Sequence, residues 1–213
     1  EHLKQVNPTA YEHEYLGIAN NTGGAVFTNL QLRTITNDEI FGTKENGQRV
    51  GGFDRILHGL DWGFYPDPAS YGKMHYDAAR RVLYIFGEMR EWKKSNEALH
   101  TQLLRTGLYA NEDLLIADSA EPKSVGDFRA YGSNCRGAEK GPDSVKYSMK
   151  WLQGLTAIVI DPARAPYHAQ EFGEYEYERT KDGEIISEFP DKNNHAIDDT
   201  RYATNLIWKR RGE

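Results

Sequence analysis

The stretch HGLDWGFYPDP, residues 58–68, marks the point where a strand is expected to end on an acid. An apolar-leaning run that starts at Phe53 reaches Asp61 and then breaks into tryptophan, glycine and proline. Because glycine and proline rarely continue the interior of a strand, the carboxylate of Asp61 is expected at a strand end, beside a turn. A lone acid in that position is usually simple turn chemistry. Asp61 therefore becomes a candidate for catalysis only if other side chains converge on it.

Three consecutive strands are expected around this stretch. The first covers residues 53–61, and two more, at 70–76 and 81–86, follow after short polar links. Strands joined by short links form an antiparallel meander. Farther along, apolar runs typical of buried strands alternate with helices: strands at 113–118 and 157–161, and helices that begin near Ser95, Pro122, Asp143 and Asn194. This order predicts a mixed α/β sheet with helices on both faces.

Two further segments lie outside that pattern. Residues 174–189 are expected to form an extra β-hairpin, because YEYERT and EIISEF flank the Asp182-Gly183 pair, a strong turn signal. Residues 1–50 are polar and interrupted by turns, and we expect them to be a lead-in segment. The main domain is therefore predicted to span residues 51–213.

Composition sets limits on class and function. The 213 residues, 38% of them hydrophobic, suffice for one domain with a real core. A net charge of −6 argues against nucleic acid, unless part of the acid excess binds a divalent cation and so reverses the local charge. One cysteine, Cys135, cannot form an intrachain disulfide, and no apolar run approaches the length of a membrane span. We expect an excised, cytoplasmic, non-membrane domain of a longer protein.

More acids occur where the predicted elements end. Asp118 ends a buried strand, and His195, Asp198 and Asp199 stand at i, i+3 and i+4 of the last helix. Ligands of such sheets gather at strand ends near the point where strand order reverses. If the last helix packs there, its side chains converge on Asp61. Two carboxylates about 4 Å apart repel by roughly 4 kcal/mol at a surface-like dielectric, so the group needs protonation or bound metal.

A set of carboxylates selects hard cations such as Mg²⁺ or Mn²⁺. Two such ions about 4 Å apart, bridged by one aspartate, support hydrolysis of a phosphodiester. Asp61 is the expected bridging ligand, and His195 is available to transfer a proton or to steady the outer shell of an ion. Two points stay open: whether Asp198 or Asp199 is a ligand, and whether Glu88, expected as a solvated residue past a strand end, adds a fourth.

Basic residues in the middle of the chain are candidate DNA contacts. A solvated surface explains them equally well, and no interleaved aromatic residues indicate base stacking. The candidates are Lys123, Arg129, Arg136, Lys140, Lys146 and Lys150.

Three segments carry a family resemblance: GLDWGFYPDPASY at 59–71, LLIADSAEPKSV at 114–125 and NNHAIDDTRYA at 193–203. Together they resemble the nuclease domain of the large terminase subunit of tailed bacteriophages, which has a ribonuclease H-like fold. The resemblance places the three metal-binding acids of the family at Asp61, Asp118 and Asp198, and its His-x-x-Asp pattern at His195 and Asp198. Relatives often have a small residue where this chain has Asp199, so the resemblance favours Asp198 as the ligand.

The resemblance also implies a function. It implies a two-metal endonuclease that cuts concatemeric double-stranded viral DNA with little sequence preference during genome packaging. The implied partners are double-stranded DNA, an ATPase motor domain of the same full-length chain, the portal protein and the small terminase subunit, in the host cell cytoplasm. The hairpin at 174–189 matches one thought to control DNA access in related terminases.

No G-x-x-x-x-G-K-[ST] phosphate loop occurs in the chain, so residues 1–50 are expected to be a remnant after a missing ATPase domain. Two alternatives remain. One is a junction-resolving or transposase-type nuclease of the same superfamily. The other is a non-catalytic docking domain of a packaging complex, in which the acids are structural caps.

Overall fold

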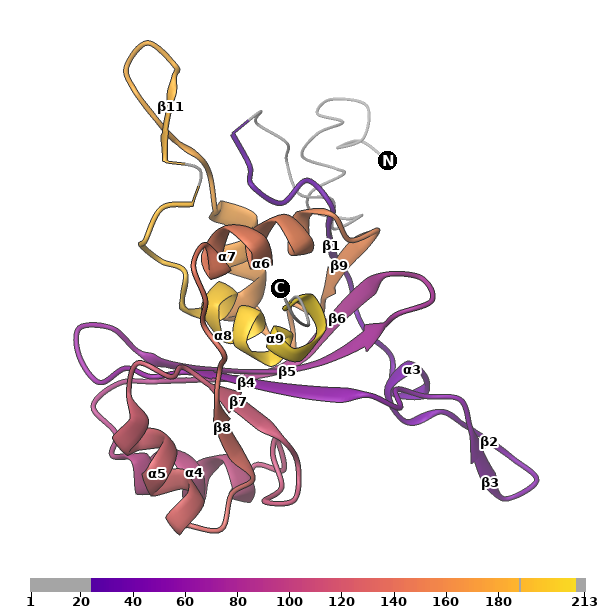
Figure 1. The fold of residues 1–213 in the computed structure, drawn as a ribbon. Helices are drawn as coiled ribbons and strands as arrows, with labels where there is room; N and C mark the ends of the chain where they lie inside the picture. Colours follow the sequence, from indigo (N-terminus) through magenta and orange to yellow (C-terminus); the bar gives the residue numbers. More distant parts are fainter. Residues whose placement is uncertain (1–23, 188, 210–213) are drawn as a thin grey trace.

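The computed structural model describes residues 24–187 and 189–209, and a seven-stranded sheet runs through it in the order β1-β9-β6-β5-β4-β7-β8 (Figure 1). β4, β5 and β6 form the predicted antiparallel meander, and every other pair in the sheet is parallel. The mixed sheet predicted from the sequence is confirmed. Its strands are β1 (Leu30–Leu32), β4 (Ile56–Asp61), β5 (Ala69–Asp77), β6 (Val82–Glu91), β7 (Leu115–Ala117), β8 (Cys135–Gly137) and β9 (Ala157–Ile160).

Helices cover both faces of the sheet (Figure 1). On one face lie α4 (Asn96–Arg105) and α5 (Pro122–Ala130), and on the other α6 (Ser144–Gln153), α7 (Pro166–Glu174), α8 (His195–Ala203) and α9 (Asn205–Trp208). Each helix layer packs on its face of the sheet through its own hydrophobic core. Strands β7 and β9 are therefore covered on both faces, which explains why their sequences are continuously apolar. Among the described residues, no helix is long and apolar enough to cross a membrane.

Residues before position 51 share this sheet. β1 pairs in parallel with β9 at the edge, and Phe27 packs on Phe172 with ring centroids 4.8 Å apart. A short helix, α3 (Asn37–Phe41), follows, and then a hairpin of β2 (Thr43–Glu45) and β3 (Gln48–Val50) that projects from one end of the sheet (Figure 1). The segment 24–32 is thus integrated with the elements that follow residue 51. The origin of residues 1–50 as a remnant of a preceding domain stays a prediction, and residues 1–23 lie outside the described residues.

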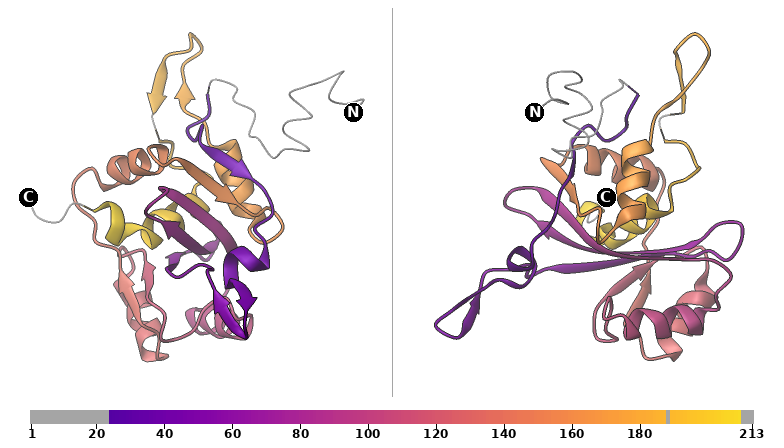
Figure 2. Two further views of the ribbon diagram at one scale, coloured as in Figure 1. Left: turned by 90° about the vertical axis from the view of Figure 1, so that its right-hand side faces the viewer. Right: turned by 180° about the vertical axis from the view of Figure 1, so that it is seen from behind.

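The second projecting hairpin confirms the extra element predicted near the C-terminus. It consists of β10 (Glu178–Arg179) and β11 (Ile185–Ser187) and extends away from the sheet (Figure 2). Helix α7, which ends at Glu174, is not expected from the sequence. The hairpin strands are shorter than predicted, because residues 175–177 form backbone hydrogen bonds with Gly24 and Val26.

Helix α8 lies directly on the backbone of β4 and β5. Gly59 and Gly72 are register partners on these strands. A Cβ atom on Gly59 would fall 1.8 Å from the carbonyl oxygen of Asp199, and one on Gly72 would fall 2.5 Å from Asp199 Oδ1. The helix can approach this closely only because neither strand position carries a side chain. The approach brings the start of α8 beside the end of β4.

Replacing Gly59 with alanine is expected to lower the free energy of unfolding by about 3 kcal/mol, because the backbone of α8 must move to admit the methyl group. Gly126→Ala is the control, since a Cβ atom at that position in α5 would meet nothing within 4 Å. The control is expected to be neutral or stabilising by up to about 1 kcal/mol. Urea denaturation measures both. Equal stability of Gly59→Ala and the wild type would contradict the close packing.

Candidate functional site

Three of the predicted acids converge at one end of the sheet. Asp61 is the last residue of β4, and Asp118 directly follows β7, its backbone N–H donating to the Leu60 carbonyl at 2.9 Å. Asp198 lies in the first turn of α8. The charges of Asp198 and Asp118 both act on Asp61 and raise its pKa. The parallel pairing of β4 with β7 and the docking of α8 therefore bring together side chains that are far apart in the sequence.

Asp61 and His195 form the buried centre of this group. Asp61 is only 8% exposed, and its Oδ2 lies 3.1 Å from His195 Nδ1. Burial raises the pKa of Asp61 to about 7, although the hydrogen bond with His195 opposes the shift. The same hydrogen bond is the main reason that the pKa of His195 is raised. The pair can therefore retain a proton near neutral pH.

Each of the other two acids contacts a basic side chain. Asp118 forms an ion pair with Lys140, and Asp198 forms one with Arg201. Burial raises the pKa of Asp198, and Arg201 opposes that shift. Within the described residues, no group of three or more His, Cys, Asp or Glu side chains is arranged so that it could hold a metal ion. The acids thus lie near one another, while the side chains of Asp118 and Asp198 contact basic partners.

The two optional ligands belong to a separate buried network. Asp199 is fully buried and accepts hydrogen bonds from Ser70 Oγ at 2.7 Å and from His168 Nε2 at 2.9 Å. Glu88 accepts one from His168 Nδ1 at 2.8 Å and two from the backbone N–H groups of Tyr167 and His168 at the start of α7. The expectation that Glu88 is a solvated residue past a strand end is wrong. It lies within β6, and its side chain is 7% exposed.

His168 carries the charge of this network. Burial alone would lower its pKa, but the neighbouring Asp199 and Glu88 outweigh burial and raise the pKa of His168 to about 10. For Glu88, burial alone would raise the pKa, but the hydrogen bonds from His168 and the helix N–H groups outweigh it and lower the pKa. His168 is therefore a buried imidazolium between two carboxylates. This residue is not expected as a site residue, because α7 itself is not predicted from the sequence. The available signal for the helix is the proline at its first position.

Glu171, also on α7, caps the next helix and is likewise missed by sequence reasoning. Its Oε2 accepts a hydrogen bond from the Ala196 backbone N–H at 2.7 Å, at the start of α8. Its other oxygen forms an ion pair with Arg90 from β6. A carboxylate near a helix N-terminus accepts hydrogen bonds from N–H groups that have no partner within the helix, and its negative charge interacts favourably with the helix dipole. Helices α7 and α8 are thus both capped by side chains from outside their own sequences.

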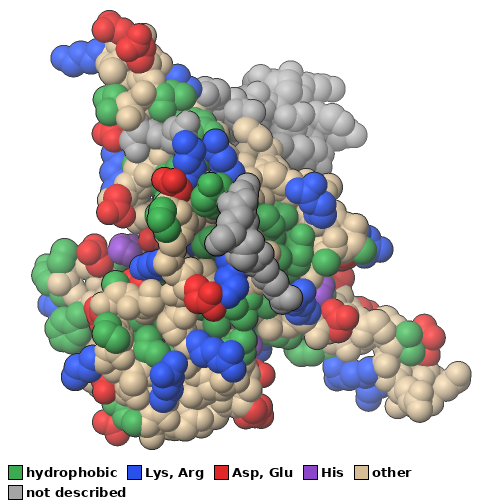
Figure 3. Space-filling view, in the orientation of Figure 1, with side chains coloured by type: hydrophobic (Ala, Val, Ile, Leu, Met, Phe, Trp, Pro, Cys, Tyr) green, Lys and Arg blue, Asp and Glu red, His purple; other side chains and the backbone are tan. Residues whose placement is uncertain are grey.

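The six basic residues suggested as DNA contacts do not share one face. Two lie on α5 and two on α6, which cover opposite faces of the sheet, and two lie in β8 and the loop after it. In Figure 3, Lys and Arg side chains are spread over the visible face with acidic side chains between them. Lys123 and Arg129 are on α5, Lys146 and Lys150 are on α6, Arg136 is in β8, and Lys140 is in the loop after β8.

The model of the terminase RNase H-like domain family matches residues 61–205, which include all three acids. The chain belongs to this family. It is 39% identical to the large terminase subunit of Bacillus phage SPP1; the match covers the whole of this chain and 48% of that protein. It is 28% identical to the PBSX phage terminase large subunit of Bacillus subtilis over 131 residues, which cover 61% of this chain and 29% of that protein. The chain therefore spans at most about half the length of these relatives.

Solved structures agree with this assignment. The nuclease domain of the SPP1 large terminase, determined with bound Mn, has a TM-score of 0.73 and 36% identity; the match covers 84% of this chain and 97% of that domain. The nuclease domain of the P22 large terminase has a TM-score of 0.56 at 13% identity, covering 86% of this chain and 92% of that one, and supports the fold alone. The ribonuclease H-like fold of terminase nuclease domains is thereby confirmed.

Replacing His168 with glutamine is expected to lower the free energy of unfolding at pH 7 by about 3 kcal/mol, because two buried carboxylates lose their cation. The pKa of His168 is raised in the folded state, so the stabilisation is complete below its ordinary value of 6.5 and is lost as pH rises through about 10. The difference between wild type and variant should therefore narrow from pH 7 to pH 10. Urea denaturation across this range measures it, and a constant difference would contradict a charged His168.

Proposed function

We propose that this domain is a metal-dependent DNA endonuclease with Asp61, Asp118 and Asp198 as its metal ligands. The supporting observation is that two adjacent strand ends and one helix start bring Asp118 and Asp198 close enough to Asp61 for their charges to act on it. Asp199 and Glu88 are not part of this set, because their oxygens accept hydrogen bonds within the buried His168 network.

The donor chemistry fits a hard divalent cation. All three side chains offer carboxylate oxygens, which suit Mg²⁺ and Mn²⁺. Related nuclease structures contain bound Mn in the SPP1 domain and bound magnesium in the domain from phage G20c. Two such ions would together activate a water molecule and stabilise the leaving oxygen of a phosphodiester. Asp61, on which the charges of both other acids act, is the proposed bridging residue.

Two of the three acids are paired with basic side chains. Lys140 offsets the charge of Asp118 and Arg201 that of Asp198, and a bound metal ion would take the place of these basic partners. His195 orients Asp61 through its Nδ1–H and holds a proton at the edge of the site, because its pKa is raised. Its Nε2 is 3.6 Å from Asp67, a residue whose side chain is 70% exposed, so a proton there has a route to solvent.

The proposed substrate is concatemeric double-stranded viral DNA, cut with little sequence preference during genome packaging. The SPP1 relative is about twice the length of this chain, so an ATPase motor domain in the full-length protein is the proposed source of additional DNA contacts. The portal protein and the small terminase subunit are the other proposed partners, in the host cell cytoplasm. Dependence on such partners reconciles a net charge of −6 with a DNA substrate.

Asp118→Ala is expected to abolish plasmid cleavage in Mn²⁺ or Mg²⁺ while the fold is retained, because it removes a ligand and relieves repulsion in the metal-free site. Asp77→Ala, at the other end of the sheet, where Asp77 pairs with Arg80, is the control and should cut as the wild type does. Nicking of supercoiled plasmid, with chelator as the blank, measures both. Cleavage near the wild-type rate by folded Asp118→Ala would refute the assignment, and equal wild-type cleavage with and without chelator would refute metal dependence.

Substitutions at two neighbouring residues distinguish the proposed metal ligand, Asp198, from the structural residue Asp199. Asp198→Asn is expected to lose Mn²⁺ binding and cleavage with a smaller loss of thermal stability than Asp199→Asn, because Asp198 is 19% exposed while Asp199 is fully buried. Asp199→Asn is expected to lower the free energy of unfolding by about 3 kcal/mol, because it leaves buried His168 without one carboxylate. Calorimetric Mn²⁺ titration and thermal melting distinguish the two. The reverse pattern would assign the ligand role to Asp199.

A further inference from the structure

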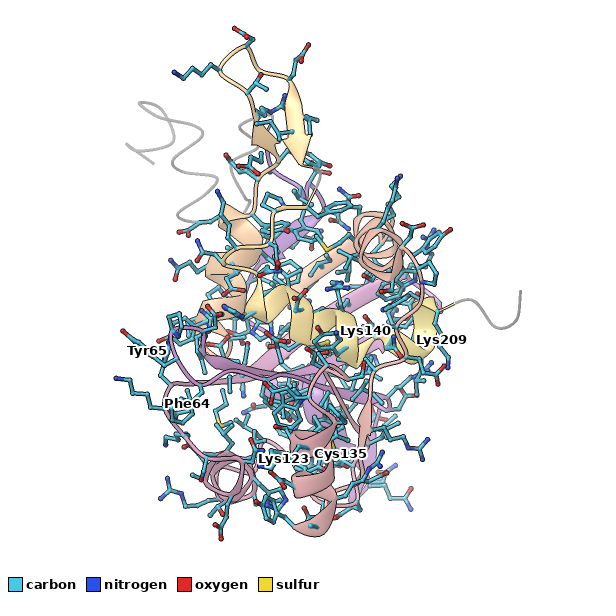
Figure 4. All side chains as sticks on the ribbon, turned by 60° about the vertical axis from the view of Figure 1, so that its left-hand side comes forward. Phe64, Tyr65, Lys123, Cys135, Lys140 and Lys209 are labelled. Atoms are coloured by element: carbon cyan, nitrogen blue, oxygen red, sulfur yellow. The ribbon has the colours of Figure 1, made fainter. Side chains whose placement is uncertain are left out.

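The connection between β4 and β5 carries two large exposed rings next to the acidic site. Phe64 is 59% exposed and Tyr65 is 66% exposed. Both extend from the edge of the molecule (Figure 4), and in the orientation of Figure 3 hydrophobic side chains gather at this end of the sheet. Single exposed hydrophobic residues are ordinary, but adjacent aromatic rings beside a candidate active site indicate a binding surface.

The loop is held in place by three contacts. Trp62 Nε1 donates a hydrogen bond to the carbonyl of Asp118 at 2.8 Å. The carbonyl of Phe64 accepts one from the Lys93 backbone N–H at 2.7 Å, and Asp67 lies 3.6 Å from His195. Two of these contacts involve residues of the acidic site itself. The exposed rings are therefore at a fixed place relative to the acids.

The surroundings of the rings combine aromatic faces with cations. Lys93 Nζ lies 4.4 Å from the centre of the Tyr65 ring. On the other side of the loop, Phe64 borders a hollow of about 440 Å³ between the loop and helices α4 and α5. Trp62 and Tyr131 add rings to its lining, and Lys94, Lys123 and the acids Glu97, Glu121 and Asp127 add charges. Of these acids, Asp127 is paired with Lys123.

Exposed rings beside Lys93 are suited to nucleobases, whose faces stack on aromatic side chains while a lysine attracts the phosphates. The hollow beside Phe64 adds rings but no net positive charge, because its lining has three acids and two lysines, and Lys94 lies 3.5 Å from Glu91. In an intact duplex the base faces are covered by their neighbours. Rings that engage bases must therefore meet steps that are unpaired or unstacked, as apolar wedges do when they bend DNA. The proposed function supplies DNA as the partner, because metal ions bound by the acids beside the loop would hold a DNA strand there.

We propose that Phe64 and Tyr65 stack on unstacked bases beside the phosphodiester that metal ions bound at Asp61 and Asp118 would hold, so that the domain prefers DNA that is locally opened next to the cut. The proposal rests on the proposed nuclease function and adds a structural preference to it. It also differs from the sequence expectation that aromatic residues give no sign of stacking. The fold supplies the sign, because it sets Lys93 against the loop.

The test compares fluorescein-labelled duplex DNA that is fully paired with the same duplex carrying a short central mismatch bubble, in Ca²⁺ to prevent cleavage. Wild type should bind the bubble more tightly. Phe64→Ala/Tyr65→Ala should weaken bubble binding about ten-fold and remove most of the preference. Its dependence on salt should not change, because no phosphate contact is lost. Anisotropy titrations measure affinity, and circular dichroism checks that the variant is folded.

Phe41→Ala is the matched control. Phe41 is 53% exposed and its ring lies 5.4 Å from the Arg49 guanidinium, so it is also an exposed ring beside a cation. It belongs to α3, next to the β2–β3 hairpin at the opposite end of the sheet from the acids (Figure 1). This variant should bind both DNAs as the wild type does.

Two outcomes overturn the proposal in distinguishable ways. If wild type neither binds these DNAs nor cuts plasmid DNA with Mn²⁺, the proposed function fails and the stacking proposal fails with it. If wild type cuts and binds but the double variant shows the same affinities and the same preference, the nuclease function stands and the rings do not contact bases. Their exposure would then be assigned to a protein partner.

Discussion

The contact of helix α8 with the paired glycines of β4 and β5 is the constraint on which the candidate site depends. With no side chain at Gly59 or Gly72, the helix backbone lies on the sheet, and Asp199 is fixed there by Ser70 and His168. Successive residues of a helix point about 100° apart, so the fixed direction of Asp199 also fixes that of its neighbour Asp198. One residue joins the helix to the sheet and the next faces the acids at the strand ends. The packing of α8 on the sheet therefore sets the directions of both residues: Asp199 holds the helix in place, and Asp198 points to the site.

The same chemical groups behave differently in the network and in the site because their exposure differs. In the His168 network the side chains are 0–7% exposed, so breaking a pair leaves an uncompensated charge in a medium of low dielectric. At the site, the Asp118–Lys140 pair is more exposed, at 17% and 39%, and such a pair is cheaper to exchange. Arg201, the partner of Asp198, is only 6% exposed and so resembles the network. Buried pairs position α7 and α8, and the more exposed pair lies at Asp118, which is proposed to bind metal.

Local sequence patterns were sufficient for much of the fold. The meander, β7, β9 and the starts of α4 and α5 follow from hydrophobic periodicity, turns and first-turn residues close in sequence. Helix α7 was missed because its cap, Glu88, comes from β6, about eighty residues earlier. Asp143 was expected to cap α6 and does precede it, but its backbone is left-handed at φ 57° and its side chain makes no capping hydrogen bond. Convergence of the acids followed from strand ends and motifs; the separation of Asp199 from Asp198 did not, because it depends on glycines in distant strands.

The chain at the end of β4 has a further geometric consequence. Side chains alternate across a strand, so Asp61 faces α8, while the next residue, Trp62, packs into the opposite layer with its ring 5.0 Å from that of Phe128 on α5. The indole N–H then bonds the carbonyl of Asp118, which ties that opposite layer to the second acid. The glycine and prolines after Trp62 lead the chain outward at the rim between the two layers. The turn that ends the strand therefore sets the exposed rings of Phe64 and Tyr65 beside the acids, where we propose that they contact DNA.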